Sequence, residues 1–169
     1  MYFKSFQQMK KQLGQLDKWL GAAVAYADTK KCDSKNFVGI RLIVDQLPFA
    51  FQVRTTCDTI KLAAARLTGK EMPAHADTEE TMQQLQERVR SVIALLDGLS
   101  AKDFEGAATR TITQPRWEGQ TMTGEDYFFE HAQPNFYFHL TTAYALLRQN
   151  AVPLGKSDFL GALTKHPAK

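Results

Sequence analysis

Two histidines and an asparagine in the last third of the sequence have the types and spacing best suited to chemistry. His131, Asn135 and His139 follow one another at intervals of four within the segment from His131 to Lys156. Side chains four residues apart share one face of a continuous helix. Imidazole is a frequent ligand of transition metals, and polar side chains between helices can also bind a small molecule. This stripe therefore marks where a metal or ligand site is expected.

The separation of the two histidines restricts the metal interpretation. His131 and His139 are eight residues apart, which is about 12 Å along an unbroken helix. Two imidazoles at that distance cannot bind one ion unless the helix is kinked or restarted. Pro134 could do either, because proline removes a backbone hydrogen bond. Alternatively, His139 is a hydrogen-bonded core histidine and His131 lies at the surface or in an interface.

Further polar side chains accompany this stripe. The hydroxyl of Tyr137, in an otherwise apolar segment, either lines a cavity between helices or belongs to the core with its polar tip paired. Asp58, in an earlier helical segment, is interpreted as a metal ligand, a base or part of a solvated face. His75, in a polar connector, and His166, in the tail, are expected at the surface. The sequence contains no phosphate-binding loop, nucleophile elbow or zinc-protease helix motif.

Composition predicts one globular domain spanning residues 1–169, with 44% hydrophobic residues and a net charge of +3. The basic residues are too few and too scattered to indicate nucleic acid as a partner. No apolar run of about 18 residues predicts a membrane span, and the start of the chain does not have the pattern of a signal peptide. Cys32 and Cys57 fit neither a disulfide framework nor a metal motif. We therefore expect reduced thiols in a cytoplasmic protein.

The elements that must position these residues are four long amphipathic segments, which predict an all-α four-helix bundle. Apolar residues recur every three or four positions over 3–28, 48–67, 78–99 and 125–150. Gly69 fits the position just past the end of the second helix, and Thr78 and Thr81 are candidate caps of the third. Between the third and fourth helices, residues 109–123 predict a short hairpin or an irregular loop. A short helical turn is expected at 158–163.

Three blocks of the sequence carry a resemblance to a known family. They are FQVRTTCDTIKLAAARLTG, TGEDYFFEHAQPNFYF and PNFYFHLTTAYALLRQNAVPLGKSDFLG. The chain resembles an uncharacterised bacterial family of DinB-like bundles, a domain of unknown function within the DinB/YfiT-like group of proposed metalloenzymes. The resemblance implies a four-helix bundle, often dimeric. Some relatives are thiol-dependent transferases or hydrolases that use a divalent metal.

Those relatives bind metal through one histidine of the second helix and a His-x-x-x-His pair of the last long helix. The resemblance places the pair at Asn135 and His139, and the second-helix position at Thr55 or at a neighbour such as Gln52. Only one histidine of the three is kept. The resemblance therefore implies a degenerate metal site in which His139 is vestigial. We expect no cofactor, with a divalent metal as the alternative, because one imidazole with an amide and a hydroxyl is a poor zinc or nickel site.

Three functions remain open on these grounds. The first is a bundle that has lost its metal site and either binds a small molecule or has no catalytic role. The second is a metal- or histidine-dependent transferase or hydrolase with a reshaped site, in which His139 acts as a base or single ligand. The third is an interaction protein that forms a homodimer through its aromatic fourth helix. The residues of the candidate pocket are His139, Asn135, Tyr137, His131, Gln52 and Thr55.

Overall fold

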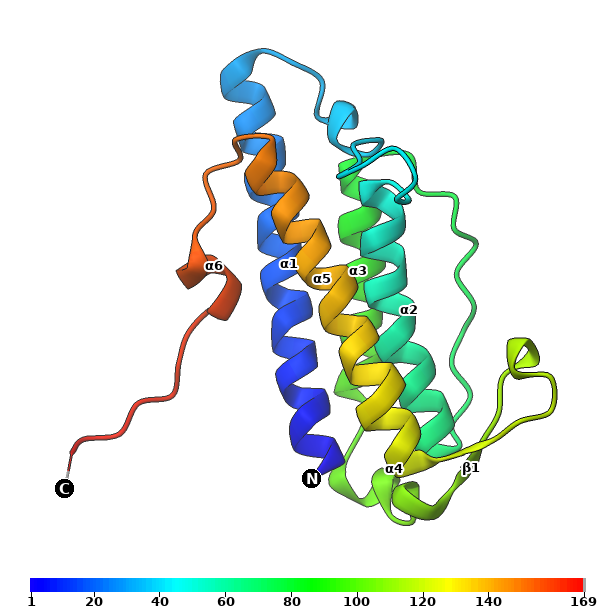
Figure 1. Ribbon diagram of the computed structural model, residues 1–169. Coiled ribbons are helices and arrows are strands. Elements are labelled where there is room, and N and C mark those ends of the chain that lie inside the picture. Colours follow the sequence, from blue (N-terminus) through cyan, green and yellow to red (C-terminus); the bar gives the residue numbers. More distant parts are fainter. Residues whose placement is uncertain (169) are drawn as a thin grey trace.

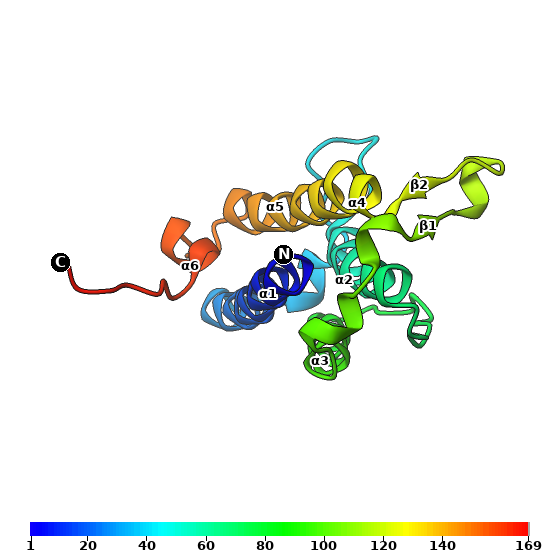
Figure 2. The ribbon, with the colours of Figure 1, turned by 90° about the horizontal axis from the view of Figure 1, so that it is seen from below.

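Four long helices packed side by side form the computed structural model, which describes residues 1–168 (Figure 1). They are α1 (Tyr2–Lys30), α2 (Phe49–Thr68), α3 (Met82–Asp97) and α5 (Gln133–Gln149). Helices α1 and α5 run in one direction, and α2 and α3 run in the opposite direction (Figure 1). Seen along its length, the bundle pairs α1 with α3 and α2 with α5 (Figure 2). The predicted all-α four-helix bundle is confirmed.

The core is formed by the apolar stripe of each long helix, which follows the spacing of three and four seen in the sequence. Leu13 and Leu20 of α1 are fully buried, as are Ile60 of α2 and Val92 of α3. Aromatic side chains fill the space between these stripes, because each buries a large apolar area. The aromatic residues that are almost completely buried are Phe6, Trp19, Phe49, Tyr127, Phe128 and Phe136.

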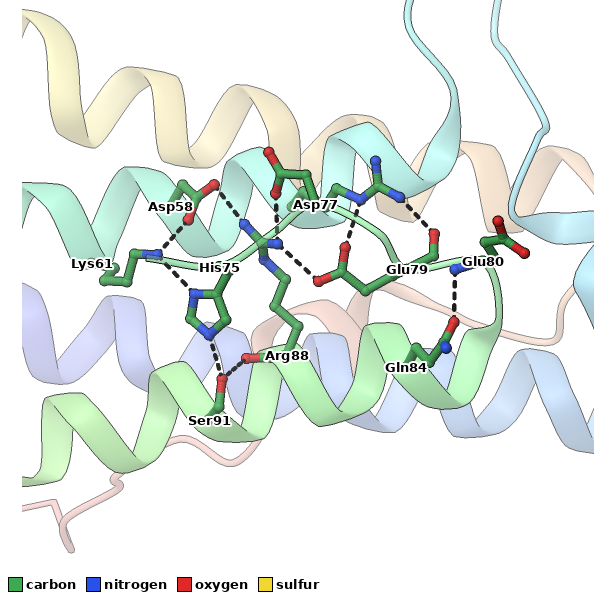
Figure 3. Close-up of polar contacts among 10 residues, drawn as sticks. Asp58, Lys61, His75, Asp77, Glu79, Glu80, Gln84, Arg88 and Ser91 are labelled. Carbon is green, nitrogen blue, oxygen red and sulfur yellow. Dashed lines mark hydrogen bonds and ion pairs between the residues drawn. The ribbon is translucent and has the colours of Figure 1, made fainter. Parts of the chain in front are cut away.

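A long connector joins α2 to α3, because these two helices run in the same direction and the chain must return along the bundle. Gly69 ends α2 with a φ of 75°, a conformation that favours glycine. The connector that follows is held by Arg88 of α3, whose side chain is only 1% exposed. Arg88 bonds Asp58 of α2 at 2.6 Å, and Asp77 and Glu79 of the connector at 2.6 and 2.8 Å (Figure 3).

Two predictions for this region were wrong. Helix α3 begins at Met82 and not at residue 78, because Thr81 caps it: the Thr81 hydroxyl accepts a hydrogen bond from the Gln84 amide N–H, and the Gln84 side chain accepts one from the Thr81 amide N–H. His75 is half-buried rather than a surface residue. Its Nδ1 lies 2.7 Å from the Lys61 ammonium nitrogen, and its Nε2 lies 2.9 Å from Ser91 Oγ (Figure 3).

The fourth helical segment is continuous and contains a π-helix. A short α4 (Gly124–Asp126) is followed by the π-helix Tyr127–Ala132 and then by α5. The backbone at Asp126 and Ala132 stays in the right-handed helical region. Pro134 lies in the first turn of α5, where it has no N–H to bond a carbonyl of the preceding turn. Pro134 therefore does not begin a separate helix, and the wider π-helical turns precede it.

A small hairpin lies between α3 and α4, as predicted. Strand β1 (Thr111–Ile112) pairs antiparallel with β2 (Met122–Thr123), and the two strands project from the bundle beside α2 and α4 (Figure 2). The turn between them contains the 3₁₀ segment Pro115–Trp117. On the side of the bundle opposite the hairpin, α6 (Lys156–Leu160) packs on α1 (Figure 2), where Trp19 donates a hydrogen bond to the Asp158 carbonyl at 3.1 Å.

None of the helices formed by residues 1–168 has both the length and the apolar character that crossing a lipid bilayer requires.

Candidate functional site

An open cleft of about 320 Å³ lies where α2, the π-helix and the hairpin turn meet. Helix α2 forms one wall, the π-helix and the start of α5 form the second, and residues 114–116 of the hairpin turn form the third. The side chains that line it are Thr55, Asp58, Thr59, Leu62, Arg66, Gln114, Pro115, Arg116, Tyr127, His131 and Asn135. Segments that are far apart in the sequence thus bring polar and apolar side chains to one place.

His131 is held in the cleft by aromatic rings and by one arginine. Its ring stacks on Tyr127 with the centroids 5.5 Å apart, and Trp117 meets it edge-on at 6.0 Å. Arg116 donates a hydrogen bond to His131 Nε2. Because arginine can only donate, the ring proton of the neutral histidine lies on Nδ1. Burial, with the charges of Arg116 and Arg66, lowers the pKa of His131, so that the ring is neutral at pH 7.

Arg66 brings a second guanidinium to the same cleft. Its Nη1 donates a hydrogen bond to the Tyr127 hydroxyl at 2.8 Å, and its guanidinium carbon lies 5.4 Å from the Tyr127 ring centroid. This geometry combines a hydrogen bond with a cation–π contact. Burial raises the pKa of Tyr127, which keeps its hydroxyl protonated at neutral pH. The cleft therefore carries two cationic side chains beside a neutral tyrosine.

Two hydrogen bonds join α2 to α5 along the wall of the cleft and beyond it. Asn135 donates to the Thr59 hydroxyl at 2.8 Å. Nearer the start of α2, Gln52 is only 1% exposed and accepts a hydrogen bond from His139 Nδ1 at 2.8 Å, while its own amide nitrogen donates to the Leu47 carbonyl at 2.7 Å. This orientation of Gln52 fixes the proton of His139 on Nδ1. Burial lowers the pKa of His139 to about 4, so this ring is also neutral at pH 7.

The six residues predicted to form the pocket fall into three places. Thr55, His131 and Asn135 line the cleft together. Gln52 and His139 form the neighbouring bonded pair. Tyr137 points to a different hollow, which is lined by residues of the start of α1 and by Gln133. Of the three residues spaced four apart, His131 and Asn135 thus line the cleft and His139 lies beside it.

The sequence did not single out several residues that form this site. Arg66, Gln114, Arg116 and Tyr127 all line the cleft. The two arginines lie 50 positions apart and were interpreted with the other scattered surface charges. No local signal links them, because the hairpin turn that brings Arg116 to α2 is a tertiary feature.

The donors at the positions implied by the metal-binding relatives do not fit a metal centre. His139 supplies one imidazole, while Gln52, Thr55 and Asn135 supply amides and a hydroxyl. Gln52 and Asn135 are already engaged in hydrogen bonds between side chains. Across residues 1–168, no group of three or more His, Cys, Asp or Glu side chains has the arrangement of a metal site. Zinc and nickel sites of proteins are built from just those donors.

Comparison with known families identifies the relatives of this chain. The family described as "Domain of unknown function (DUF1993)" matches residues 1–160. The chain belongs to this family. A crystal structure of a DinB family member from Shewanella denitrificans is 45% identical, with a TM-score of 0.92 over 96% of this chain and 93% of that one. The DinB-like bundle implied by the sequence blocks is confirmed. A search of curated proteins finds no significant match.

Proposed function

We propose that this DUF1993 protein is a small-molecule-binding bundle that works without a metal ion. The observation that carries the proposal is the cleft between α2, the π-helix and the hairpin turn, which gathers Thr55, His131 and Asn135. Its volume of about 320 Å³ lies at the lower end of the range for small-molecule sites. A ligand of a few carbon atoms with one or two polar groups matches that size.

The donor chemistry of the site supports binding in preference to metal catalysis. Gln52 and His139 hold each other through a direct hydrogen bond, and Asn135 bonds Thr59. These contacts link α2 to α5 at the level where relatives place metal ligands. The site thus has neutral, oriented polar groups beside a cleft, which is the typical composition of a binding pocket. The free thiols of Cys32 and Cys57 are compatible with the reducing cytoplasm that we propose as its location.

Amide NMR of chelator-treated protein, titrated with a library of small neutral and charged fragments, tests this function. We expect at least one fragment class to shift the signals of Thr55, His131 and Asn135. Thr55→Phe should abolish the shifts by filling the cleft, whereas Thr141→Phe, at an exposed position of α5, should leave them intact. Shifts that require added Zn²⁺, or that map away from the cleft for every fragment, would contradict the proposal.

Self-association is a second candidate function, favoured by exposed apolar side chains. Leu42, Ile43 and Val44, in the loop before α2, are 52%, 60% and 88% exposed, and Phe138 of α5 is 58% exposed. Consecutive exposed apolar side chains, such as the three of the loop, are typical of interaction surfaces. We propose that they contact a second copy of the chain. Sedimentation velocity should give a dimer that Ile43→Asp weakens, and a monomer at all concentrations would exclude this role.

A further inference from the structure

We propose that the cleft binds a small organic anion, whose carboxylate or phosphate group is held between Arg66 and Arg116. This inference rests on the proposed function and adds the chemical class of the ligand. It is carried by the charge, the free hydrogen-bond donors and the apolar wall of the same cleft.

The two arginines of the cleft differ in their partners from three arginines of the bundle, whereas Arg41, Arg110 and Arg148 likewise have no carboxylate within 4 Å in the described residues. Arg54, Arg88 and Arg90 each have a carboxylate oxygen within 3.1 Å. Within residues 1–168, neither Arg66 nor Arg116 has a carboxylate within 4 Å.

Each of the two guanidiniums also has donors to spare. A guanidinium carries five N–H groups and no acceptor. Arg66 uses one on the Tyr127 hydroxyl, and Arg116 uses one on His131. The remaining N–H groups can bind an oxyanion, and the planar guanidinium suits carboxylate and phosphate in particular.

Two residues of the cleft also have a buried donor without a partner. Gln114 is only 9% exposed, and its amide nitrogen has no hydrogen-bond partner in the part of the chain that the structure describes. Nδ1 of His131 also has no hydrogen-bond partner among the described residues. This nitrogen carries the ring proton because Arg116 donates to Nε2. Buried donors without partners are rare in folded proteins. Both residues line the cleft, but the two nitrogen atoms are covered by neighbouring atoms, so an oxyanion in the cleft would accept from them only after those neighbours moved.

The one carboxylate of the cleft does not neutralise these arginines. Asp58 lines the cleft as well, but its two oxygens are bonded to Arg88 of α3 at 2.6 Å and to Lys61 at 2.8 Å (Figure 3). Its charge is therefore balanced by cations on the side of the connector. The positive charges of Arg66 and Arg116 remain, and together with burial, which is the larger cause, they lower the pKa of His131.

The rest of the lining indicates that the anion has a carbon skeleton. Leu62 is 41% exposed and Pro115 is exposed, and both line the cleft. Tyr127 also lines the cleft, and its ring packs with those of His131 and Trp117, each centroid lying 5.5 to 6.2 Å from the other two. Apolar walls of this kind contribute to binding through the area that they remove from water. An inorganic ion would leave them unused.

Calorimetric titration with matched probes tests the proposal. Benzoate and phenyl phosphate carry the two oxyanions, benzyl alcohol is the neutral counterpart, and inorganic phosphate lacks the carbon skeleton. We expect benzoate or phenyl phosphate to bind at least about tenfold more tightly than benzyl alcohol and inorganic phosphate, as expected for one charge-assisted hydrogen bond or more. Which of the two binds more tightly identifies the preferred oxyanion.

Charge-removing variants locate the binding. Arg116→Gln, at an exposed position, should weaken the tighter anion about tenfold, and Arg66→Gln should do the same if circular dichroism shows it folded. Arg148→Gln, an exposed arginine at the end of α5, is the matched control and should have no effect. Equal losses in all three variants would show a general effect of charge and overturn the proposal.

The remaining outcomes separate this inference from the proposed function. If benzyl alcohol binds in the cleft as tightly as both anions, the anion proposal is overturned and the small-molecule site stands. If inorganic phosphate binds as tightly as phenyl phosphate, the inference that the anion has a carbon skeleton is overturned. If no neutral or charged probe shifts the NMR signals of the cleft, both proposals fail together.

Discussion

Replacement of Gln52 by methionine tests whether the direct bond between α2 and α5 organises this part of the bundle. Methionine has about the length of glutamine and fills the same space, but it can make neither of the two amide hydrogen bonds. Gln52 is 1% exposed, accepts from His139 Nδ1 at 2.8 Å and donates to the Leu47 carbonyl at 2.7 Å. The change therefore leaves two polar groups without their partner and creates little cavity.

The expected cost follows from those two groups. A buried polar group that loses its partner costs about 1–3 kcal/mol. Leu47 is 46% exposed and His139 is half-buried, so water replaces part of what is lost. We expect Gln52→Met to lower the free energy of unfolding by about 2–3 kcal/mol. His139→Leu, which leaves only the Gln52 carbonyl oxygen unpaired, should cost about 1–2 kcal/mol.

A double-mutant cycle by urea unfolding measures the bond itself. The two changes remove the same contact. The double variant should therefore lose about 1–2 kcal/mol less stability than the sum of the two single losses. Gln83→Met, at an exposed position of α3, is the matched control and should stay within about 0.5 kcal/mol of the parent protein. A loss below about 0.5 kcal/mol for Gln52→Met, or additive single losses, would refute the reasoning.

Three further predictions concern pH, metal and thiol chemistry. Burial lowers the pKa of His139 from 6.5 to about 4, so the fold favours the neutral ring. This contribution to stability is complete above pH 6.5 and is lost as the pH falls through about 4. In urea unfolding, the parent protein should therefore lose more stability between pH 7 and pH 4 than His139→Leu does. Thr55→His with Asn135→His adds two imidazoles beside His139 and should create Co²⁺ binding, visible by absorbance and absent in the parent. Burial raises the pKa of the Cys57 thiol to about 12, which makes this thiol unreactive in the folded protein. Ellman's reagent should therefore modify only the exposed Cys32 in the folded chain and both thiols in urea. Modification of two thiols in the folded protein would contradict this.

The helices were predictable because their signals are local. The apolar spacing of α1 and α2, and Gly69 just beyond the end of α2, place these elements within a residue or two of where the structure has them. The start of α3 was placed too early. Glu79 is an acidic residue of the kind typical of a first helical turn, but in the structure it bonds Arg54 and Arg88 of other segments. No pattern within the segment shows those distant partners.

The candidate site was predictable only in part. Intervals of four on a regular helix place His131 and Asn135 near one another, and both line the cleft. The interval says nothing about the π-helix before Pro134 or about the hairpin turn opposite it. Arg66 and Arg116 come together only because that turn lies across the cleft from α2, and a long-range arrangement of this kind leaves no periodic signal in the sequence.

The state of the His139 ring is the most direct test of the account. Nitrogen-15 NMR of the imidazole rings, recorded with and without one equivalent of Zn²⁺, reads the protonation and ligation of each nitrogen. At pH 7 the account predicts a neutral ring with its proton on Nδ1, bonded to Gln52, and an Nε2 signal that Zn²⁺ leaves unchanged. A stoichiometric shift of the Nε2 signal on addition of Zn²⁺ would contradict it.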